Sequence, residues 1–308
     1  MSKIYDIAVV GAGPAGMSAA IYARRAAKTV ILFEALSVGG QIVTANEVEN
    51  YPAIKKISGF DLANELYEQA EALGCEFEFS RVSAAENDGA LKKITCEDGS
   101  EYLAKAIIIA VGARCRKLGI DNEERLTGAG VSYCAVCDGA FFAGKTVAVN
   151  GGGNSAVDDA LYLADHAKTV YLVHRRDGFR AEDVKMEQIR ARDNIVLRTN
   201  AVVEAINGKD TVKSLSLRDT RTGEQSELAV DGLFIAIGRV PETEIFGDMI
   251  ELDEAGYVVA GEDCRTKVPG VFVAGDCRTK AVRQLVTAAS DGAIAATAAS
   301  EYINTLKI

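Results

Sequence analysis

The sequence has little of several residue types, and each shortage excludes something. Only 4 of its 308 residues are Pro, whereas 29 are Gly, which favours tight turns between strands and helices over Pro-rich linkers. Basic residues are outnumbered, with 34 Lys and Arg against 44 Asp and Glu, and the net charge is -10. Because binding to phosphates needs a basic surface, the sequence predicts no nucleic-acid partner and no anionic membrane partner.

Long apolar runs are also missing. The most apolar stretch, residues 106–111, is far shorter than the ~20 residues that cross a bilayer. Residues 1–6 lead into a strand without the apolar segment of a signal peptide. We therefore expect a cytoplasmic protein. Because thiols are kept reduced in that compartment, a disulfide among the 7 cysteines would be catalytic rather than structural.

The start of the chain has the pattern of a dinucleotide-binding unit. The apolar run over 4–10 predicts a buried parallel strand, and Gly11-Ala12-Gly13-Pro14-Ala15-Gly16 follows it. A helical stretch over 17–27 comes next, and a second strand over 29–33 ends at Glu34. The glycines permit a pyrophosphate to approach the N-terminus of the helix, and the acid suits the hydroxyls of an adenosine ribose.

The same pattern recurs from residue 148, where a strand runs into Gly151-Gly152-Gly153-Asn154-Ser155. The register holds through the unit, so that Glu34 falls on His174, and the repeat predicts two nucleotide-binding domains of similar build. His174 is followed by Arg175 and Arg176, with Arg180 nearby. Arginine binds phosphate bidentately and keeps its charge, so we predict FAD or NAD in the first domain and NADP in the second. A solvated basic face is the alternative.

The remaining segments add similar parts to both units. After the first unit we expect a helix over 60–73, a β-meander over 75–79, 91–96 and 101–104, and a strand over 106–113. After the second unit we expect strands near 195–205, 212–219 and 226–230, then one over 233–237. A strand ending at Gly275-Asp276 leads to a long Ala-rich helix. The predicted fold class is α/β, with two Rossmann-like three-layer domains carrying β-meander insertions.

Cys134-Ala135-Val136-Cys137-Asp138 is the motif around which the rest of the chain is organised. Its spacing suits a small-loop disulfide, a redox couple or half of a zinc site. Zinc needs two further ligands at metal spacing, but the other cysteines are dispersed and both histidines lie in the second nucleotide unit. We therefore predict no metal, and we favour a redox pair over a plain buried pair.

Reduction of a disulfide requires a proton for the leaving sulfur. No His lies near the pair in the sequence, so Asp138 is the candidate acid and base, and capping of a helix from Gly139 is its other candidate role. We expect a hydride to pass from nicotinamide to flavin, and electrons to pass from there to the disulfide. The other cysteines are predicted to be core residues, apart from the hypothesis that Cys277 lies near the flavin.

Taken together, these motifs resemble those of the bacterial-type, low-molecular-weight thioredoxin reductases, a class of the pyridine nucleotide-disulfide oxidoreductases. The resemblance covers essentially the whole chain and rests on residues 134–139, 174–180, 39–41 with 48–50, and 275–276 with 283–284. It implies FAD in a discontinuous domain over 1–114 and 243–308, NADPH in a domain over 115–242, a homodimer, and reduction of thioredoxin. Reduction of another small disulfide or of a thioredoxin-like protein of a peroxiredoxin system is the alternative.

The resemblance also implies roles for single residues. Cys137 would face the flavin, Cys134 would attack the disulfide of thioredoxin, and Asp138 would donate the proton. The residues predicted to bind FAD are Gly11, Gly13, Pro14, Ala15, Gly16, Glu34, Ala35, Gly39, Gly40, Gln41, Asn50, Val82, Ala110, Gly112, Gly275, Asp276, Arg283, Gln284 and Leu285. Those predicted to bind NADP are Gly151, Gly153, Asn154, Ser155, His174, Arg175, Arg176, Arg180 and Gly238.

Two positions depart from the family pattern, since Val111 stands where Thr is usual and Ala53 where Gly usually follows Pro. The order of the motifs adds a further expectation. The Cys pair precedes the second Gly-rich turn and so belongs to the NADPH domain. We therefore expect the two domains to rotate about joints near 114–118 and 239–244, so that the disulfide and the nicotinamide reach the flavin in turn.

Overall fold

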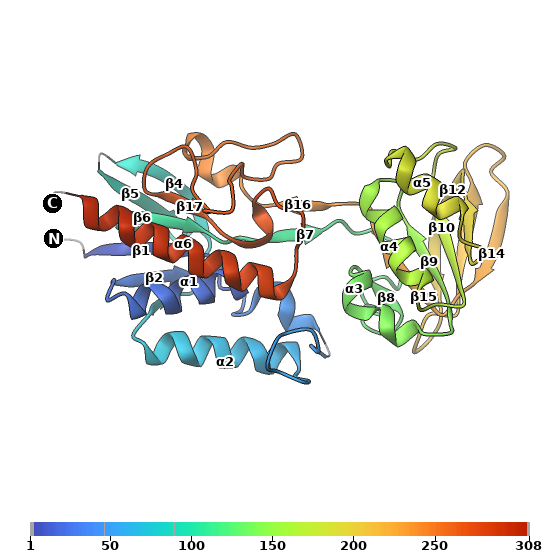
Figure 1. Cartoon of the computed structure of the whole chain (residues 1–308), viewed down its shortest axis with the longest axis horizontal. Helices are drawn as coiled ribbons and strands as arrows, with labels where there is room; N and C mark the ends of the chain where they lie inside the picture. The colour runs from blue at the N-terminus through green and yellow to red at the C-terminus, as the bar shows by residue number, and fades with distance from the viewer. Residues whose placement is uncertain (1–2, 46, 89, 307–308) are drawn as a thin grey trace. The chain divides into compact units, whose positions relative to one another are not determined.

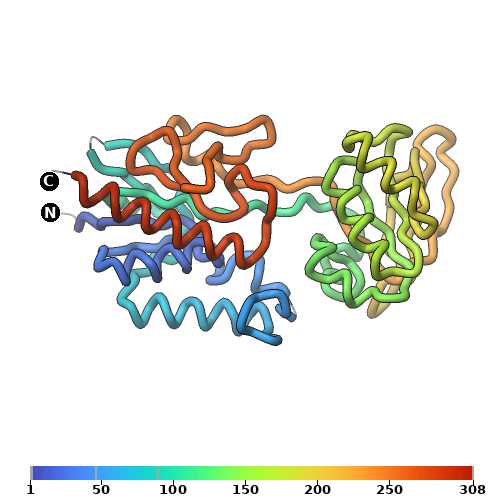
Figure 2. The backbone as a smooth tube through the Cα atoms, viewed as in Figure 1, coloured from blue at the N-terminus to red at the C-terminus, as the bar shows by residue number. Residues whose placement is uncertain are grey.

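The chain folds into two units in the computed structural model, which describes residues 3–45, 47–88 and 90–306. One unit combines the residues up to Arg114 with those from Val240 on, and the other is Cys115–Arg239 (Figure 1). The backbone leaves the first unit once and returns once (Figure 2). It does so through β7 (Ala113–Cys115) and β16 (Arg239–Pro241), which pair with each other. The second crossing falls between Arg239 and Val240, within the range 239–244 expected for the joint and three residues before the expected domain boundary at 242 and 243.

The first unit is built on a seven-stranded sheet in the order β3-β2-β1-β6-β5-β4, with β17 beside β6. Its parallel strands are β1 (Ile4–Val10), β2 (Val30–Phe33), β3 (Glu76–Glu78), β6 (Glu101–Ile109) and β17 (Val271–Val273). Successive residues of a strand point to opposite faces, so Ile7 and Val9 enter one buried cluster and Ala8 and Val10 the other. Burial on both faces explains the unbroken apolar run of β1.

Helices cover one face of this sheet. The helices α1 (Pro14–Arg25) and α6 (Leu285–Thr305) lie side by side (Figure 1), and their small residues share one cluster with Ile7 and Val9. The helix α2 (Gly59–Ala72) begins after Ser58, whose hydroxyl accepts the Asp61 N–H. The short helices η1 (Gly40–Thr44), η3 (Glu244–Met249) and η4 (Gly275–Cys277) complete the unit, and η3 packs into the cluster on the opposite face.

The second unit repeats the parallel arrangement on a five-stranded sheet in the order β11-β10-β9-β15-β8. The strands are β8 (Val131–Ser132), β9 (Thr146–Asn150), β10 (Thr169–Val173), β11 (Ile195–Arg198) and β15 (Gly232–Ile235). Its helices are α3 (Ala135–Asp138), η2 (Gly139–Phe142), α4 (Asn154–Ala164) and α5 (Asp183–Arg190). An antiparallel three-stranded sheet of β12 (Ala201–Asn207), β13 (Ser214–Asp219) and β14 (Gln225–Ala229) is inserted before β15.

The predicted fold class is confirmed, but the meander of the first unit is placed differently from the expectation. The segment expected at 75–79 forms β3, a parallel edge strand beside β2. The meander instead consists of β4 (Val82–Asp88), β5 (Leu91–Cys96) and β6. The sequence did not reveal β4 because only Val82 and Ala85 of its residues are buried.

Two other expected boundaries are wrong. The strands expected at 101–104 and 106–113 are one strand, β6, because the amine of Lys105 reaches Asp6 (2.9 Å) and its charge does not interrupt the strand. The strand expected near 195–205 is divided between β11, which joins the parallel sheet, and β12, which joins the antiparallel one. Among the described helices, none is long and apolar enough to cross a membrane.

Substitution of Gly292 tests the packing of α6 on α1. A Cβ at this position would lie 2.1 Å from the Ala15 carbonyl oxygen, so Gly292→Ala forces the two backbones apart. We expect the free energy of unfolding to fall by ~1–3 kcal/mol, as for other overpacked sites, measured by urea denaturation. Ser290→Ala, an exposed change on the same helix, is the control and should have little effect. Equal stability of the two variants would contradict the close packing.

Candidate functional site

In the turn after β1, two glycines are packed tightly against backbone and a third leaves free space beside it. Gly11 has φ +107° and a Cβ there would lie 2.4 Å from the Ala110 carbonyl oxygen. A Cβ on Gly16 would lie 1.8 Å from the Gly11 carbonyl oxygen. At Gly13, which directly precedes α1, the nearest atom to an added Cβ is 4.0 Å away. The turn thus leaves room for a phosphate group just before the first N–H groups of the helix.

Glu34 holds this turn together. Its carboxylate accepts the Ala12 N–H (2.9 Å) and the Leu36 N–H (2.8 Å), and the Gly39 N–H donates to the Ala12 carbonyl (2.7 Å). Each carboxylate oxygen accepts about two hydrogen bonds. Glu34 therefore keeps capacity for ribose hydroxyls while it fixes the turn, and the adjacent Ala35 is exposed.

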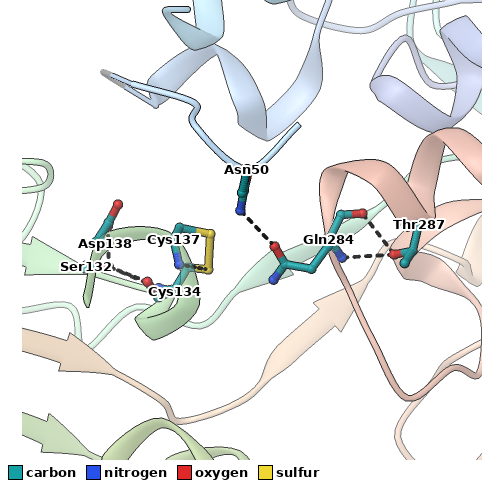
Figure 3. The surroundings of a disulfide bond; sticks show 7 residues. All are labelled: Asn50, Ser132, Cys134, Cys137, Asp138, Gln284 and Thr287. Atoms are coloured by element: carbon teal, nitrogen blue, oxygen red, sulfur yellow. Dashed lines mark hydrogen bonds between the residues drawn. A yellow bond between two sulfur atoms is a disulfide. The ribbon is translucent and has the colours of Figure 1, made fainter. Parts of the chain in front are cut away.

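The predicted amide side chains lie at two other places in the first unit. Gln41 donates to the Ala113 carbonyl (2.9 Å), beside Gly112. Asn50 donates to Gln284 (3.3 Å), and Gln284 with Thr287 forms a capping box at the start of α6, directly before Leu285 (Figure 3). The nearby Ala53 has φ +71°, a conformation that favours Gly, which explains why the family usually has Gly there.

The short helix η4 is fixed by a buried ion network. Arg278 and Asp291 are 1% and 3% exposed, and Arg278 donates to both carboxylate oxygens of Asp291 (2.8 and 2.9 Å). Asp291 also accepts the Lys280 amine (2.8 Å) and the Gly275 N–H (3.0 Å). Burial alone would raise the pKa of Asp291, but the two cations outweigh it and the pKa is lowered. This network sets the position of Asp276.

Arg283 also holds the segment that contains Asp276. Its guanidinium donates to the carbonyls of Asp276 and Arg278 (both 3.2 Å) and lies 4.1 Å from the centre of the Tyr257 ring. Cys277 is fully buried, and burial raises the pKa of its thiol to about 12. It is therefore a protonated core residue rather than a reactive thiol. The predicted Val82 is likewise buried, at the start of β4.

The second Gly-rich turn repeats the contact of the first. A Cβ on Gly151 would lie 2.3 Å from the Ala236 carbonyl oxygen, whereas nothing lies within 4 Å of a Cβ on Gly153. Asn154 begins α4, and its side chain pairs with Glu182 through two hydrogen bonds (2.9 and 3.0 Å). Ser155 is exposed in the first turn of α4. Gly238 has φ +107° and its carbonyl accepts the Arg116 N–H (3.0 Å).

The basic segment after β10 folds back to this turn. The Arg180 N–H donates to the Gly152 carbonyl (2.7 Å), which brings the loop beside the start of α4. Arg175, Arg176 and Arg180 are exposed, and their guanidinium groups make no hydrogen bond or ion pair with other described residues. Three unpaired arginines beside an open glycine turn form a site for an anion.

His174 is placed differently from these arginines. It is 6% exposed, its ring stacks on Phe179 at 5.1 Å, and a Cβ on Gly152 would lie 2.1 Å from the ring. Burial and the charges of Arg180, Arg175 and Arg176 lower its pKa, so the ring is neutral at neutral pH. The His174 ring therefore packs against Gly152 of the turn, and the exposed arginines supply the positive charge.

Cys134 and Cys137 form a disulfide at the start of α3, with a Cα–Cα distance of 5.3 Å. Cys134 directly precedes the helix and its sulfur accepts the Cys137 N–H (3.2 Å). Cys137 is exposed, whereas Cys134 is half-buried. Of the five other cysteines, Cys75, Cys96, Cys264 and Cys277 are buried and Cys115 is half-buried. The pair thus differs from the rest in its disulfide bond, and Cys137 differs from the other six cysteines in being exposed.

Asp138 ends α3 and its carboxylate turns back toward β8 rather than forward. Its Oδ2 accepts the hydroxyl of Ser132 (2.6 Å), as Figure 3 shows. No side-chain hydrogen bond caps η2, so the alternative role of Asp138 as a helix cap is wrong. Ser132 and Asp291 are both close to predicted residues, yet no motif in the sequence marked them. Only their place in the fold reveals them.

A model of the pyridine nucleotide-disulphide oxidoreductases matches residues 5–292 of the chain. The chain belongs to this family. Membership implies that a flavin and a nicotinamide nucleotide are its redox groups. It also confirms the family resemblance that the motifs predicted.

Relatives that match nearly the whole of this chain are named as thioredoxin reductases, one of them as a bifunctional protein. The thioredoxin reductase of Bacillus subtilis is 44% identical over 99% of this chain and 96% of its own length. The bifunctional thioredoxin reductase/thioredoxin of Mycobacterium leprae is 43% identical over 97% of this chain, which spans 66% of that protein. The crystal structure of the Streptococcus pyogenes thioredoxin reductase is 40% identical, with a TM-score of 0.94, 99% of this chain and 100% of that chain covered.

Substitution of Asp291 tests the ion network under η4. Asp291→Asn leaves the buried Arg278 with the exposed Glu262 (3.3 Å) as its remaining carboxylate partner and removes the carboxylate that Lys280 contacts, so we expect the free energy of unfolding at pH 7 to fall by ~3–5 kcal/mol. Because the folded-state pKa of Asp291 is lowered, its stabilisation is complete above the ordinary value of ~4 and is lost as the pH falls through the folded-state pKa.

The difference between wild type and Asp291→Asn should therefore shrink below about pH 4, measured by denaturant unfolding across pH. The exposed Asp248→Asn is the control and should change stability by less than about 0.5 kcal/mol. A difference that stayed constant down to pH 2 would show that the charge of Asp291 does not stabilise the fold.

Proposed function

We propose that this chain is a thioredoxin reductase that binds FAD in its first unit and NADPH in its second. The observation that carries the proposal is the Cys134–Cys137 disulfide, held on a short helix beside Asp138 in the unit that contains the second Gly-rich turn. The redox pair and the nicotinamide-nucleotide turn thus share one unit, and the acidic Glu34 turn belongs to the other. Electrons must pass between the units to connect them.

The residues of the first turn fit FAD. Glu34 has capacity for ribose hydroxyls, Gly13 leaves room for a pyrophosphate, and Asp276 lies in a segment that the Asp291 network holds in place. Three other predicted side chains belong to the same unit, where Gln41 contacts Ala113, Asn50 contacts Gln284 and Arg283 contacts the Asp276 carbonyl. These residues, rather than the whole predicted set, carry the assignment of FAD.

The residues of the second turn fit NADPH rather than NADH. An acid at the end of the second strand suits a free 2′-hydroxyl, whereas arginines suit a 2′-phosphate. Here Arg175, Arg176 and Arg180 are exposed and unpaired beside Gly152. Gly153 leaves space at the N-terminus of α4 for the pyrophosphate.

Thioredoxin as the substrate is supported by the names of the relatives. The Bacillus subtilis and Streptococcus pyogenes proteins are called thioredoxin reductases, and the longer Mycobacterium leprae relative is named for both activities. The homodimer implied by the resemblance stays a prediction.

The chain's own residues would perform the last steps. When bound, nicotinamide and flavin supply two electrons to the disulfide. The S–S bond then breaks, one sulfur remains a thiolate and the other takes a proton from Asp138, whose carboxylate accepts a replacement proton from water. Cys134 then attacks the disulfide of thioredoxin, and Cys137 displaces the reduced thioredoxin as the Cys134–Cys137 bond forms again.

Cys137→Ser tests the electron path. We expect the variant to lose thioredoxin reduction, because it cannot form the disulfide, and to keep the bleaching of its yellow flavin by NADPH under anaerobic conditions. Cys115→Ser, which removes the half-buried cysteine outside the pair, is the control and should keep both activities. Thioredoxin and a small-molecule disulfide are assayed side by side. A colourless wild-type protein, or loss of bleaching in Cys137→Ser, would overturn the proposed path.

Arg175→Ala combined with Arg176→Ala tests the choice of NADPH. Each loss removes a charge-assisted hydrogen bond to a 2′-phosphate, so we expect the KM for NADPH to rise on the order of 10²-fold while that for NADH changes little. Steady-state kinetics with both nucleotides provide the measurement. Lys209→Ala, an exposed basic residue on the β12–β13 turn, is the control. An unchanged ratio of the two KM values would refute the assignment.

A further inference from the structure

Ser132 occupies a central position between the redox pair and the proposed acid. It is 4% exposed at the end of β8, two residues before Cys134. Its hydroxyl donates to Asp138 Oδ2 (2.6 Å) and accepts the Cys134 N–H (3.1 Å). The same side chain therefore connects the backbone of one redox cysteine with the carboxyl group that follows the other (Figure 3).

We propose that Ser132 is a positioning residue that holds the carboxyl group of Asp138, the residue after Cys137, in one place in both of its protonation states. The inference rests on the proposed function, because it assigns Asp138 the role of proton donor. It goes beyond that function by naming a residue that touches neither cofactor nor substrate. No motif of the sequence contains it.

The hydroxyl group is suited to this role because its hydrogen bond can reverse. A hydroxyl has one proton to donate and two lone pairs that accept. When Asp138 is ionised, the Ser132 O–H donates to Oδ2, which is far closer than its other acceptor, the Cys134 carbonyl at 3.4 Å. When Asp138 is protonated, its O–H donates to Ser132 Oγ and the serine proton turns to the Cys134 carbonyl.

The Cys134 N–H donates to Ser132 Oγ in either state, which keeps the hydroxyl oxygen fixed while its proton moves. Oγ then accepts at most two hydrogen bonds, one from the N–H and one from the protonated carboxyl, which its lone pairs allow. To reach the leaving sulfur, the carboxyl proton turns away from Ser132 Oγ, and the serine O–H turns back from the Cys134 carbonyl to Oδ2. The carboxylate thus keeps this partner until it regains a proton from water. Its half-buried carboxyl is accessible for that exchange.

The residue that follows Ser132 anchors the same stretch of backbone. Tyr133, the residue after Ser132, donates its hydroxyl proton to Glu123 (2.7 Å). Glu123 is 1% exposed and also accepts the N–H groups of Leu118 and Gly119 (2.9 and 2.8 Å). The backbone that carries Ser132 is therefore anchored, so Ser132 acts from a fixed point.

A double-mutant cycle in the full-length holoenzyme separates this role from a merely structural one. Asp138→Asn removes the proton donor and should lower kcat for thioredoxin reduction ~10²–10⁴-fold. Ser132→Ala should lower kcat about 10- to 100-fold, as expected for loss of one hydrogen bond to a charged group. It should leave the KM for thioredoxin and NADPH, the flavin content and the rate of flavin bleaching unchanged.

The decisive result is the double variant. If Ser132 acts through Asp138, then Ser132→Ala in the Asp138→Asn background changes kcat less than about twofold, because coupled residues are not additive. The same loss in both backgrounds would overturn the proposal, since it would mean that Ser132 supports only the backbone of Cys134. A lower flavin content or slower bleaching in Ser132→Ala would overturn it as well.

A single-turnover experiment distinguishes this proposal from the function on which it rests. NADPH is mixed with wild type and with Ser132→Ala, and the appearance of two thiols at Cys134 and Cys137 is followed with a thiol-reactive probe. Thiols that form in wild type without reduction of thioredoxin would refute the substrate and leave Ser132 supported if the variant is slower. If no thiols form in wild type, the electron path fails and the role of Ser132 fails with it.

Discussion

Both units depend on one constraint, the contact between a glycine and the carbonyl of the neighbouring strand. In the first unit a Cβ on Gly11 would lie 2.4 Å from the Ala110 carbonyl oxygen, and in the second a Cβ on Gly151 would lie 2.3 Å from that of Ala236. Without a side chain there, each central strand can turn sharply into its helix. The open glycine that follows, Gly13 or Gly153, then faces the place for a pyrophosphate. Most predicted nucleotide residues lie around these two turns.

The two turns are supported in different ways. In the first unit Glu34 fixes the turn by hydrogen bonds, and a buried network of Arg278, Lys280 and Asp291 holds the segment that contains Asp276. In the second unit the support is the neutral, buried ring of His174 under Gly152. Because His174 carries no charge there, the exposed and unpaired Arg175, Arg176 and Arg180 supply the positive charge of this turn. The difference matches the ligands proposed for the two units, since of FAD and NADPH only NADPH carries a 2′-phosphate that needs positive charge.

The environments of the cysteines explain why some only pack in the core while two form the disulfide. Burial raises the pKa of the Cys75, Cys264 and Cys277 thiols to about 12, so these remain protonated and unreactive. Cys134 and Cys137 instead form a disulfide on a short helix that ends at Asp138, and Cys137 is exposed. In the proposed mechanism their reactivity follows from this exposure and from Asp138 as a positioned proton donor, which the buried thiols lack.

The sequence by itself indicated two Gly-rich, nucleotide-type units and a close cysteine pair, and it singled out Asp138 as the candidate acid, because glycine spacing, strand runs and the CxxC motif are local in the chain. It did not determine β4, whose few buried residues give no clear pattern, or the union of two expected strands in β6, where Lys105 reaches Asp6. Ser132, Asp291 and the buried position of His174 were decided only by the tertiary structure. Their roles arise from partners across turns and between elements, and a hydrogen bond formed on folding leaves no fixed spacing in the sequence.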